Sequence, residues 1–105
     1  MKLSTALSYA GGFKEGVDQV VALEKAGLDM VWVAEAYSFD APTQMGYLAA
    51  KTSTVEIASG ILPIYTRTPT LTAMTAASLD ALSEGRFVLG LGASGPQVIE
   101  GFHGV

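Results

Sequence analysis

The stretch Val55–Pro69, VEIASGILPIYTRTP, decides how the rest of the chain is interpreted. It begins as an apolar strand, is interrupted at Ser59-Gly60, resumes with Ile61-Leu62 and ends in a polar loop closed by a second proline. A glycine inside a strand often marks a bulge or the close approach of a ligand. The stretch therefore predicts a strand whose interruption serves a purpose.

Predicted strands and helices alternate along the rest of the chain. Apolar content predicts three more strands, and one-face apolar spacing predicts three helices and a last helical piece. In chain order, these segments span residues 2–9, 13–24, 28–34, 40–52, 70–83, 86–91 and 97–102. Strand starts are roughly 26 to 31 residues apart, a spacing typical of βαβ units. The alternation predicts an α/β fold with a parallel sheet and right-handed crossovers.

Two architectures fit this (βα)4 pattern: an open α/β sheet, or the N-terminal half of a TIM (β/α)8 barrel. The pattern alone slightly favours the open sheet, because a complete barrel takes about 250 residues and the chain has 105. No linker or low-complexity segment divides the chain, so we expect a single domain.

Local signals place several side chains within these elements. Asp40 is predicted to cap the second helix, with Pro42 in its first turn, and Gly27 is predicted to end the first helix. The nearly continuous apolar run 28–34 predicts a strand covered on both faces, with Trp32 in the core. The predicted inner face of the third helix comprises Leu71, Met74, Ser78, Leu79 and Leu82.

Composition excludes several classes of function. The net charge of −4 and the scattered basic residues argue against a nucleic-acid surface, because phosphate binding needs clustered lysines and arginines. The absence of cysteine excludes a disulfide scaffold and thiolate chemistry. The apolar stretch at the N-terminus is too short and too polar for a signal peptide, and no apolar run approaches the roughly 18 residues of a membrane span. We therefore expect a cytoplasmic protein without a membrane partner.

Three segments carry a family resemblance: SGILPIYTRTP (59–69), PTLTAMTAASLDALSEGRFVLGLGASGPQVIEGFHGV (69–105) and LEKAGLDMVWVAEAY (23–37). They resemble the luciferase-like monooxygenase superfamily, and within it most closely the coenzyme F420-dependent oxidoreductases. The resemblance covers essentially the whole chain and implies a (β/α)8 barrel, of which this chain resembles only the first four βα units. It favours the half-barrel, so residues 1–105 are expected to form a single luciferase-like domain that is truncated relative to the family.

Residues that follow each strand are the candidates for an active site, because parallel α/β folds bind ligands at the carboxyl ends of their strands. The predicted catalytic residues are Glu35, which could transfer a proton, and Tyr37, which could hydrogen-bond substrate. The alternatives are a solvated rim carboxylate and a tyrosine that caps the barrel mouth. Arg67, on the loop that leaves the third strand, is predicted to steer an anionic cofactor or to pair with Asp40 or Glu35.

The resemblance implies that small residues at two strand ends bind the cofactor. In the family, the third strand carries a non-proline cis peptide that backs the cofactor's ring system, and the matching bond here is Gly60-Ile61. The later glycine-rich turn would let the ring or its ribityl chain lie against the backbone. The alternatives are an ordinary bulge and a tight strand-to-loop turn. The predicted cofactor-binding residues are Gly60, Ile61, Leu62, Gly92, Ala93 and Ser94.

The function implied by the resemblance is hydride transfer between reduced coenzyme F420 and a small organic substrate. An FMN-dependent monooxygenase that uses oxygen is the alternative. A third reading, from another class, is an inactive half-barrel that self-associates into a homo-oligomer through its exposed first and fourth strands. His103, the only histidine, is predicted to be incidental, and no metal site is expected because a lone histidine has no partner ligands.

Overall fold

A parallel sheet organises the chain, as predicted. The computed structural model describes residues 1–8, 12–36 and 38–104. The main sheet has the strand order β1-β2-β3-β5, and every neighbouring pair in it is parallel. Beyond its carboxyl end, β4 pairs with β6, also in parallel. The strands are β1 (Ser4–Ala6), β2 (Met30–Val33), β3 (Glu56–Ser59), β4 (Leu62–Pro63), β5 (Phe87–Val88) and β6 (Leu91–Gly92).

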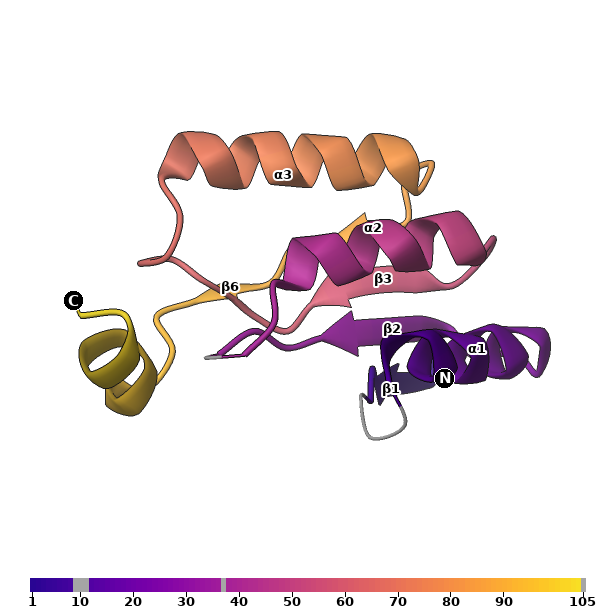
Figure 1. Ribbon diagram of the computed structural model, residues 1–105. Coiled ribbons are helices and arrows are strands. Elements are labelled where there is room, and N and C mark those ends of the chain that lie inside the picture. Colours follow the sequence, from indigo (N-terminus) through magenta and orange to yellow (C-terminus); the bar gives the residue numbers. More distant parts are fainter. Residues whose placement is uncertain (9–11, 37, 105) are drawn as a thin grey trace.

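The helices alternate with the strands and lie on one side of the sheet (Figure 1). They are α1 (Phe13–Lys25), α2 (Ala41–Lys51) and α3 (Pro69–Leu82), and a short π-helical segment, η1 (Gln97–Phe102), follows β6. η1 lies beyond the carboxyl ends of the strands (Figure 1). None of the helices in the described part of the chain is long and apolar enough to cross a membrane.

Local chemistry sets the helix ends where the sequence predicts them. The Asp40 side chain caps α2 by accepting a hydrogen bond from Thr43 N at 3.0 Å, with Pro42 in the first turn. Gly27, just past the end of α1, has a φ of 104°, a left-handed conformation that favours glycine. Both predictions are confirmed.

Only one face of the sheet is packed. Val31, Val33 and Ile57 point toward the helices and are at most 1% exposed. On the opposite face, Trp32, Ala58 and Val88 lie in register across β2, β3 and β5. Trp32 is 38% exposed there, so the predictions of a strand covered on both faces and of a core tryptophan are wrong. Successive side chains of a strand point to opposite faces, and no described helix lies on the second face (Figure 1).

The predicted inner face of α3 is also wrong, apart from Leu79, which is buried. Leu71, Met74 and Leu82 are 47%, 61% and 64% exposed. Ser78 is exposed as well. The helix packs through the row one position further along, which includes Leu79, Thr72 and Ala76. Small and apolar residues occupy both rows of α3, so the periodicity did not distinguish the buried row.

Glu24, near the end of α1, fixes the approach to β3. Its Oε2 accepts hydrogen bonds from the backbone N–H groups of Ser53, Thr54 and Val55 at 2.9, 2.7 and 2.8 Å. Partial burial raises the pKa of the Glu24 carboxyl, but these hydrogen bonds outweigh it, so the pKa lies below its ordinary value. Folding therefore favours the ionised form, and this contribution to stability is present at neutral pH and lost as the pH falls.

Replacing Glu24 with Gln should lower the free energy of unfolding by about 2 kcal/mol near pH 7, because the three N–H groups lose their charged acceptor. The deficit should shrink as the pH falls from the ordinary carboxyl pKa of 4.5 through the lower pKa of folded Glu24, because the native carboxylate then also becomes protonated. Urea unfolding of both proteins near pH 7 and below pH 4.5 measures the difference in the free energy of unfolding. Asp18→Asn, an exposed change on the same helix, is the control and should have little effect. An equal loss at both pH values would contradict the role of the charge.

Candidate active site at the strand ends

Two neighbouring strands are interrupted at the same level, and a serine joins the interruptions. β3 ends at Ser59, and the Gly60-Ile61 peptide that follows is cis, as predicted. The Ser59 hydroxyl donates to Gly90 O at 2.9 Å and accepts from Gly90 N at 2.8 Å. Leu62 N also donates to Gly90 O, at 2.9 Å. β3 and β5 are therefore interrupted at the same level, and the two chain segments pair again beyond the interruption as β4 and β6.

Close packing accounts for the glycines at this step. A Cβ at Gly90 would overlap the carbonyl oxygen of Ser59, and one at Gly92 would overlap the Ile61 side chain. A Cβ at Gly60 would lie 3.0 Å from Trp32 Cε3. The step thus brings Gly60 and Ile61 together with Gly92, which the sequence predicts as parts of one site. It also gives these glycines a packing role that needs no ligand.

The other predicted cofactor-binding residues lie in different surroundings. Leu62 is fully buried, so its side chain packs in the core next to the interruption of β3. Ala93 is exposed, and Ser94 is half-buried with a φ of 67°. This left-handed conformation is uncommon for a residue other than glycine. Their cofactor-binding roles stay predictions.

Arg67 joins the loop after β4 to the end of β2. Its Nη1 and Nη2 donate to the two carboxylate oxygens of Glu35 at 2.5 and 2.9 Å, and Nη2 also donates to Asp40 Oδ1 at 2.8 Å. The side chains of Arg67 and Glu35 are only 9% and 11% exposed. The predicted pairing of Arg67 with these two acids is confirmed, and it takes the bidentate geometry that guanidinium and carboxylate prefer.

The pKa values of Arg67 and Asp40 are both moved toward the ionised form. Hydrogen bonding to Glu35 raises the pKa of Arg67 and outweighs burial, which lowers it. Burial raises the pKa of Asp40, but hydrogen bonds from Thr43 and the charge and hydrogen bond of Arg67 bring it below its ordinary value. The cluster is therefore a fixed ion network at neutral pH.

Glu35 has a further partner, because its Oε2 also accepts a hydrogen bond from Ala41 N at 2.7 Å. The carboxylate thus holds the first turn of α2 and the loop after β4 in one arrangement. These contacts favour a positioning role for Glu35, and its catalytic role stays a prediction. Tyr37, the second predicted catalytic residue, lies outside the described residues.

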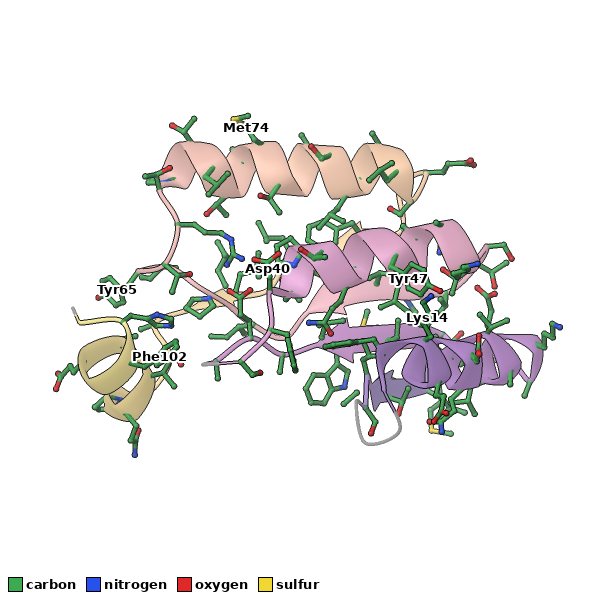
Figure 2. All side chains as sticks on the ribbon, in the orientation of Figure 1. Lys14, Asp40, Tyr47, Tyr65, Met74 and Phe102 are labelled. Carbon is green, nitrogen blue, oxygen red and sulfur yellow. The ribbon has the colours of Figure 1, made fainter. Side chains whose placement is uncertain are left out.

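A cleft of about 350 Å³ opens beside the ion network. Its walls come from the loops after β2 and β4 and from the end of η1. His103 lines it, with Nε2 3.2 Å from Ala36 O. Phe102, which precedes His103, also lines the cleft, and it lies at the far end of the molecule from α1 (Figure 2). Sequence reasoning missed His103, because no local pattern signals that the chain after β6 folds back to the end of β2.

Comparison with known proteins identifies the class of this chain. It matches the family described as luciferase-like monooxygenase over residues 1–105. The chain therefore belongs to the luciferase-like monooxygenase family. Among solved structures, the coenzyme F420-dependent tetrahydromethanopterin reductase from Methanopyrus kandleri superposes with a TM-score of 0.87 at 23% identity, covering 97% of this chain and 30% of that chain. That likeness shows the fold, and it places the parallel sheet and its helices as part of a TIM barrel.

Individual relatives are closer in sequence. The chain is 43% identical over 106 residues to "Putative coenzyme F420-dependent oxidoreductase Rv3520c" of Mycobacterium tuberculosis, covering 99% of this chain and 30% of that protein. It is 25% identical, with a TM-score of 0.83, to an F420-dependent secondary alcohol dehydrogenase solved with an F420-acetone adduct, covering 100% of this chain and 36% of that one. The chain thus spans about 30% of the length of Rv3520c.

Replacing Arg67 with Met should lower the free energy of unfolding by about 3 kcal/mol, because it leaves the Glu35 carboxylate buried without its cation. The double variant Glu35→Gln with Arg67→Met should lose less than the sum of the single losses, as measured by denaturant unfolding. Lys2→Met is the matched control: it removes an ion pair whose side chains are 75% and 36% exposed, and should cost less than about 1 kcal/mol. Additive losses at positions 35 and 67 would refute the coupling.

Gly90→Ala tests the close contact between the two strands where β3 and β5 are interrupted together. The added methyl group would meet the Ser59 carbonyl, so the variant should unfold at lower denaturant concentration, with a loss of about 1–3 kcal/mol. Gly46→Ala, inside α2, is the control, because its Cβ meets no atom within 4 Å. That variant should gain about 0.5–1 kcal/mol from helix propensity. Equal stability of the two variants would mean that β3 and the strand beside it can separate freely at Gly90.

Proposed function

We propose that this chain forms the ring-binding part of a coenzyme F420-dependent oxidoreductase, in which hydride passes between the reduced deazaflavin and a small organic substrate. The observation that carries the proposal is the 43% identity to Rv3520c across 99% of this chain. Since the chain spans 30% of that protein, the activity belongs to a whole barrel, and this part is proposed to hold the cofactor ring.

The open face of the sheet fits a flat and largely apolar ring. Segments 30–33, 57–63 and 87–92, which end at the rim, contain no charged side chain. The row formed by Trp32, Ala58 and Val88 gives this face an apolar surface, 38% and 37% exposed at its two larger members. Gly60 adds backbone without a side chain directly beside Trp32. Because the interior of a complete barrel is filled by side chains, the ring is proposed to lie at the strand-end rim of this face, beside Gly60, where it would cover apolar area.

Residues of this chain would then bind and orient, whereas the bound deazaflavin supplies the hydride chemistry. Gly60 and Ile61 would back the ring, and the Ser94 hydroxyl would donate a hydrogen bond to a cofactor oxygen. Tyr37 is proposed to hydrogen-bond substrate. The pair of Glu35 and Arg67 would act through the backbone, by holding the loops around the strand ends in place.

Titration of the chain with F420 and, separately, with FMN tests the proposal. Trp32 is the only tryptophan, so its fluorescence reports on the open face. F420 should quench it saturably and bind more tightly than FMN, with equilibrium dialysis as an independent measure. Ser94→Ala should weaken F420 binding severalfold, whereas Met74→Ala, at an exposed position on α3, should not change it. Tighter binding of FMN, or saturable binding of neither, would overturn the proposal and favour the monooxygenase or the inactive fragment.

A further inference from the structure

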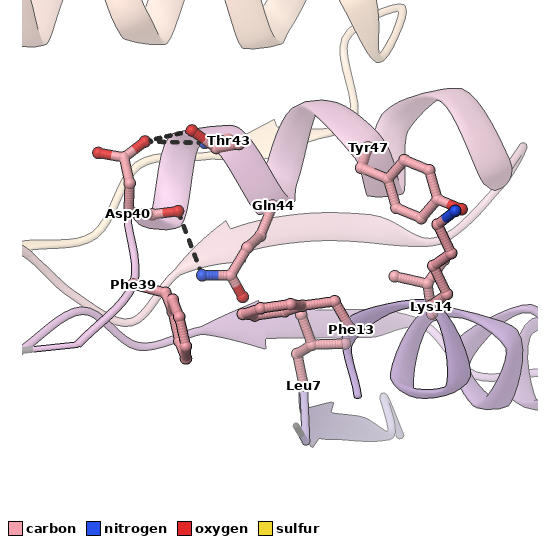
Figure 3. Close-up of a pocket in the computed structure, with 9 residues that line it drawn as sticks. Leu7, Phe13, Lys14, Phe39, Asp40, Thr43, Gln44 and Tyr47 are labelled. Atoms are coloured by element: carbon pink, nitrogen blue, oxygen red, sulfur yellow. Dashed lines mark hydrogen bonds between the residues drawn. The ribbon is translucent and has the colours of Figure 1, made fainter. Parts of the chain in front are cut away.

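A second cleft, of about 470 Å³, lies on the helix side of the molecule between the starts of α1 and α2 (Figure 3). Its volume falls within the range of pockets that hold small molecules, about 300–1,000 Å³. Phe39 and Asp40 border both clefts, but the floor of this one is formed by Leu7, just after β1, and by Val17 on α1. No step of the proposed oxidoreductase function uses it.

The walls of this cleft are aromatic and aliphatic. The Phe13 and Phe39 rings meet edge to face, with centroids 4.5 Å apart, and Tyr47 lines the opposite side (Figure 3). Leu7 and Val17 close the bottom and are 7% and 2% exposed. Phe13 and Phe39 remain 36% and 51% exposed, so an apolar molecule in the cleft would cover ring surface that now meets water.

One buried polar atom points into this apolar space. Gln44 is 9% exposed, and its Nε2 donates to Asp40 O at 3.1 Å, which fixes the orientation of the amide. The other amide atom, Gln44 Oε1, has no hydrogen-bond partner among the described residues and is directed toward Phe13 (Figure 3). A buried acceptor without a donor costs about 1–3 kcal/mol, so such groups are rare in folded proteins.

The rim of the cleft carries one charge of each sign, Lys14 and Asp40. The Asp40 carboxylate is already paired with Arg67 and turned away from the cleft (Figure 3), and the apolar walls favour a neutral molecule over an ion. The one acceptor at the wall and the aromatic surround then define the complementary ligand. It has a flat apolar body of about one ring and a single hydrogen-bond donor.

We propose that this cleft is a binding site for a small neutral aromatic molecule with one donor, of the phenol class, whose O–H donates to Gln44 Oε1 while its ring lies against Phe13 and Phe39. The site contains none of the residues proposed to bind the cofactor, although Phe39 and Asp40 also border the strand-end cleft. The donor satisfies the unpaired oxygen, and the ring displaces water from the aromatic walls.

Phenol and anisole are the probes, because they differ only by the methyl group that removes the donor. In titrations followed by methyl and side-chain amide NMR signals, phenol should shift the signals of Leu7, Val17 and the Gln44 amide saturably. It should bind roughly tenfold more tightly than anisole, the value of one hydrogen bond. Gln44→Leu should abolish the difference while leaving anisole affinity unchanged.

Two controls keep the test decisive. Leu71→Ala, in the strand-end cleft, should leave both affinities unchanged, because that residue does not border this site. Phe13→Ala should weaken both probes together, since it removes ring surface but not the acceptor. Equal affinity for phenol and anisole, or the absence of saturable shifts in the unmodified chain, would overturn the proposal without reliance on any variant.

Discussion

The hydrogen bonds between Ser59 and Gly90 are the constraint on which the carboxyl end of the sheet depends. One hydroxyl serves both the N–H and the carbonyl of the neighbouring strand, at the level where both strands leave the main ladder. An interruption in one strand alone would leave unpaired backbone groups in a buried sheet, which is costly. Because the two steps match, the ladder resumes beyond them, and the loop that carries Arg67 starts from a defined point.

The one-sided burial of the sheet follows from the same arrangement of strands. Helices cover the face that carries Val31 and Ile57, and the opposite face presents Trp32 and Val88 in one row. Parallel sheets are normally covered on both faces. In a TIM barrel the second face points inward and is filled by the remaining strands. This explains why Trp32, in the middle of a strand and paired in register with Ala58, is 38% exposed.

Features encoded within a few residues could be predicted from the sequence, and features set by distant packing could not. The Asp40 cap depends on three neighbouring positions, and the pairing of Arg67 depends on two strand ends that a parallel sheet must bring to one edge. The buried row of α3 was unpredictable because small or apolar residues occur on both sides of that helix. His103 was missed because its place in the cleft depends on the path of the whole segment after β6.

The two clefts share Phe39 and Asp40, and Asp40 serves each of them through a different group. The Asp40 carboxylate caps α2 and binds Arg67 beside the strand-end cleft, whereas its carbonyl accepts from Gln44 beside the second cleft. A change at Asp40 that shifted its backbone would therefore disturb both clefts. Glu35 borders only the strand-end cleft, where it pairs with Arg67. Gln44 borders only the second cleft, where it donates to the Asp40 carbonyl. Substitution of Gln44 can consequently disturb the second cleft alone, because the Asp40 cap and the contact of Glu35 with Ala41 N stay in place.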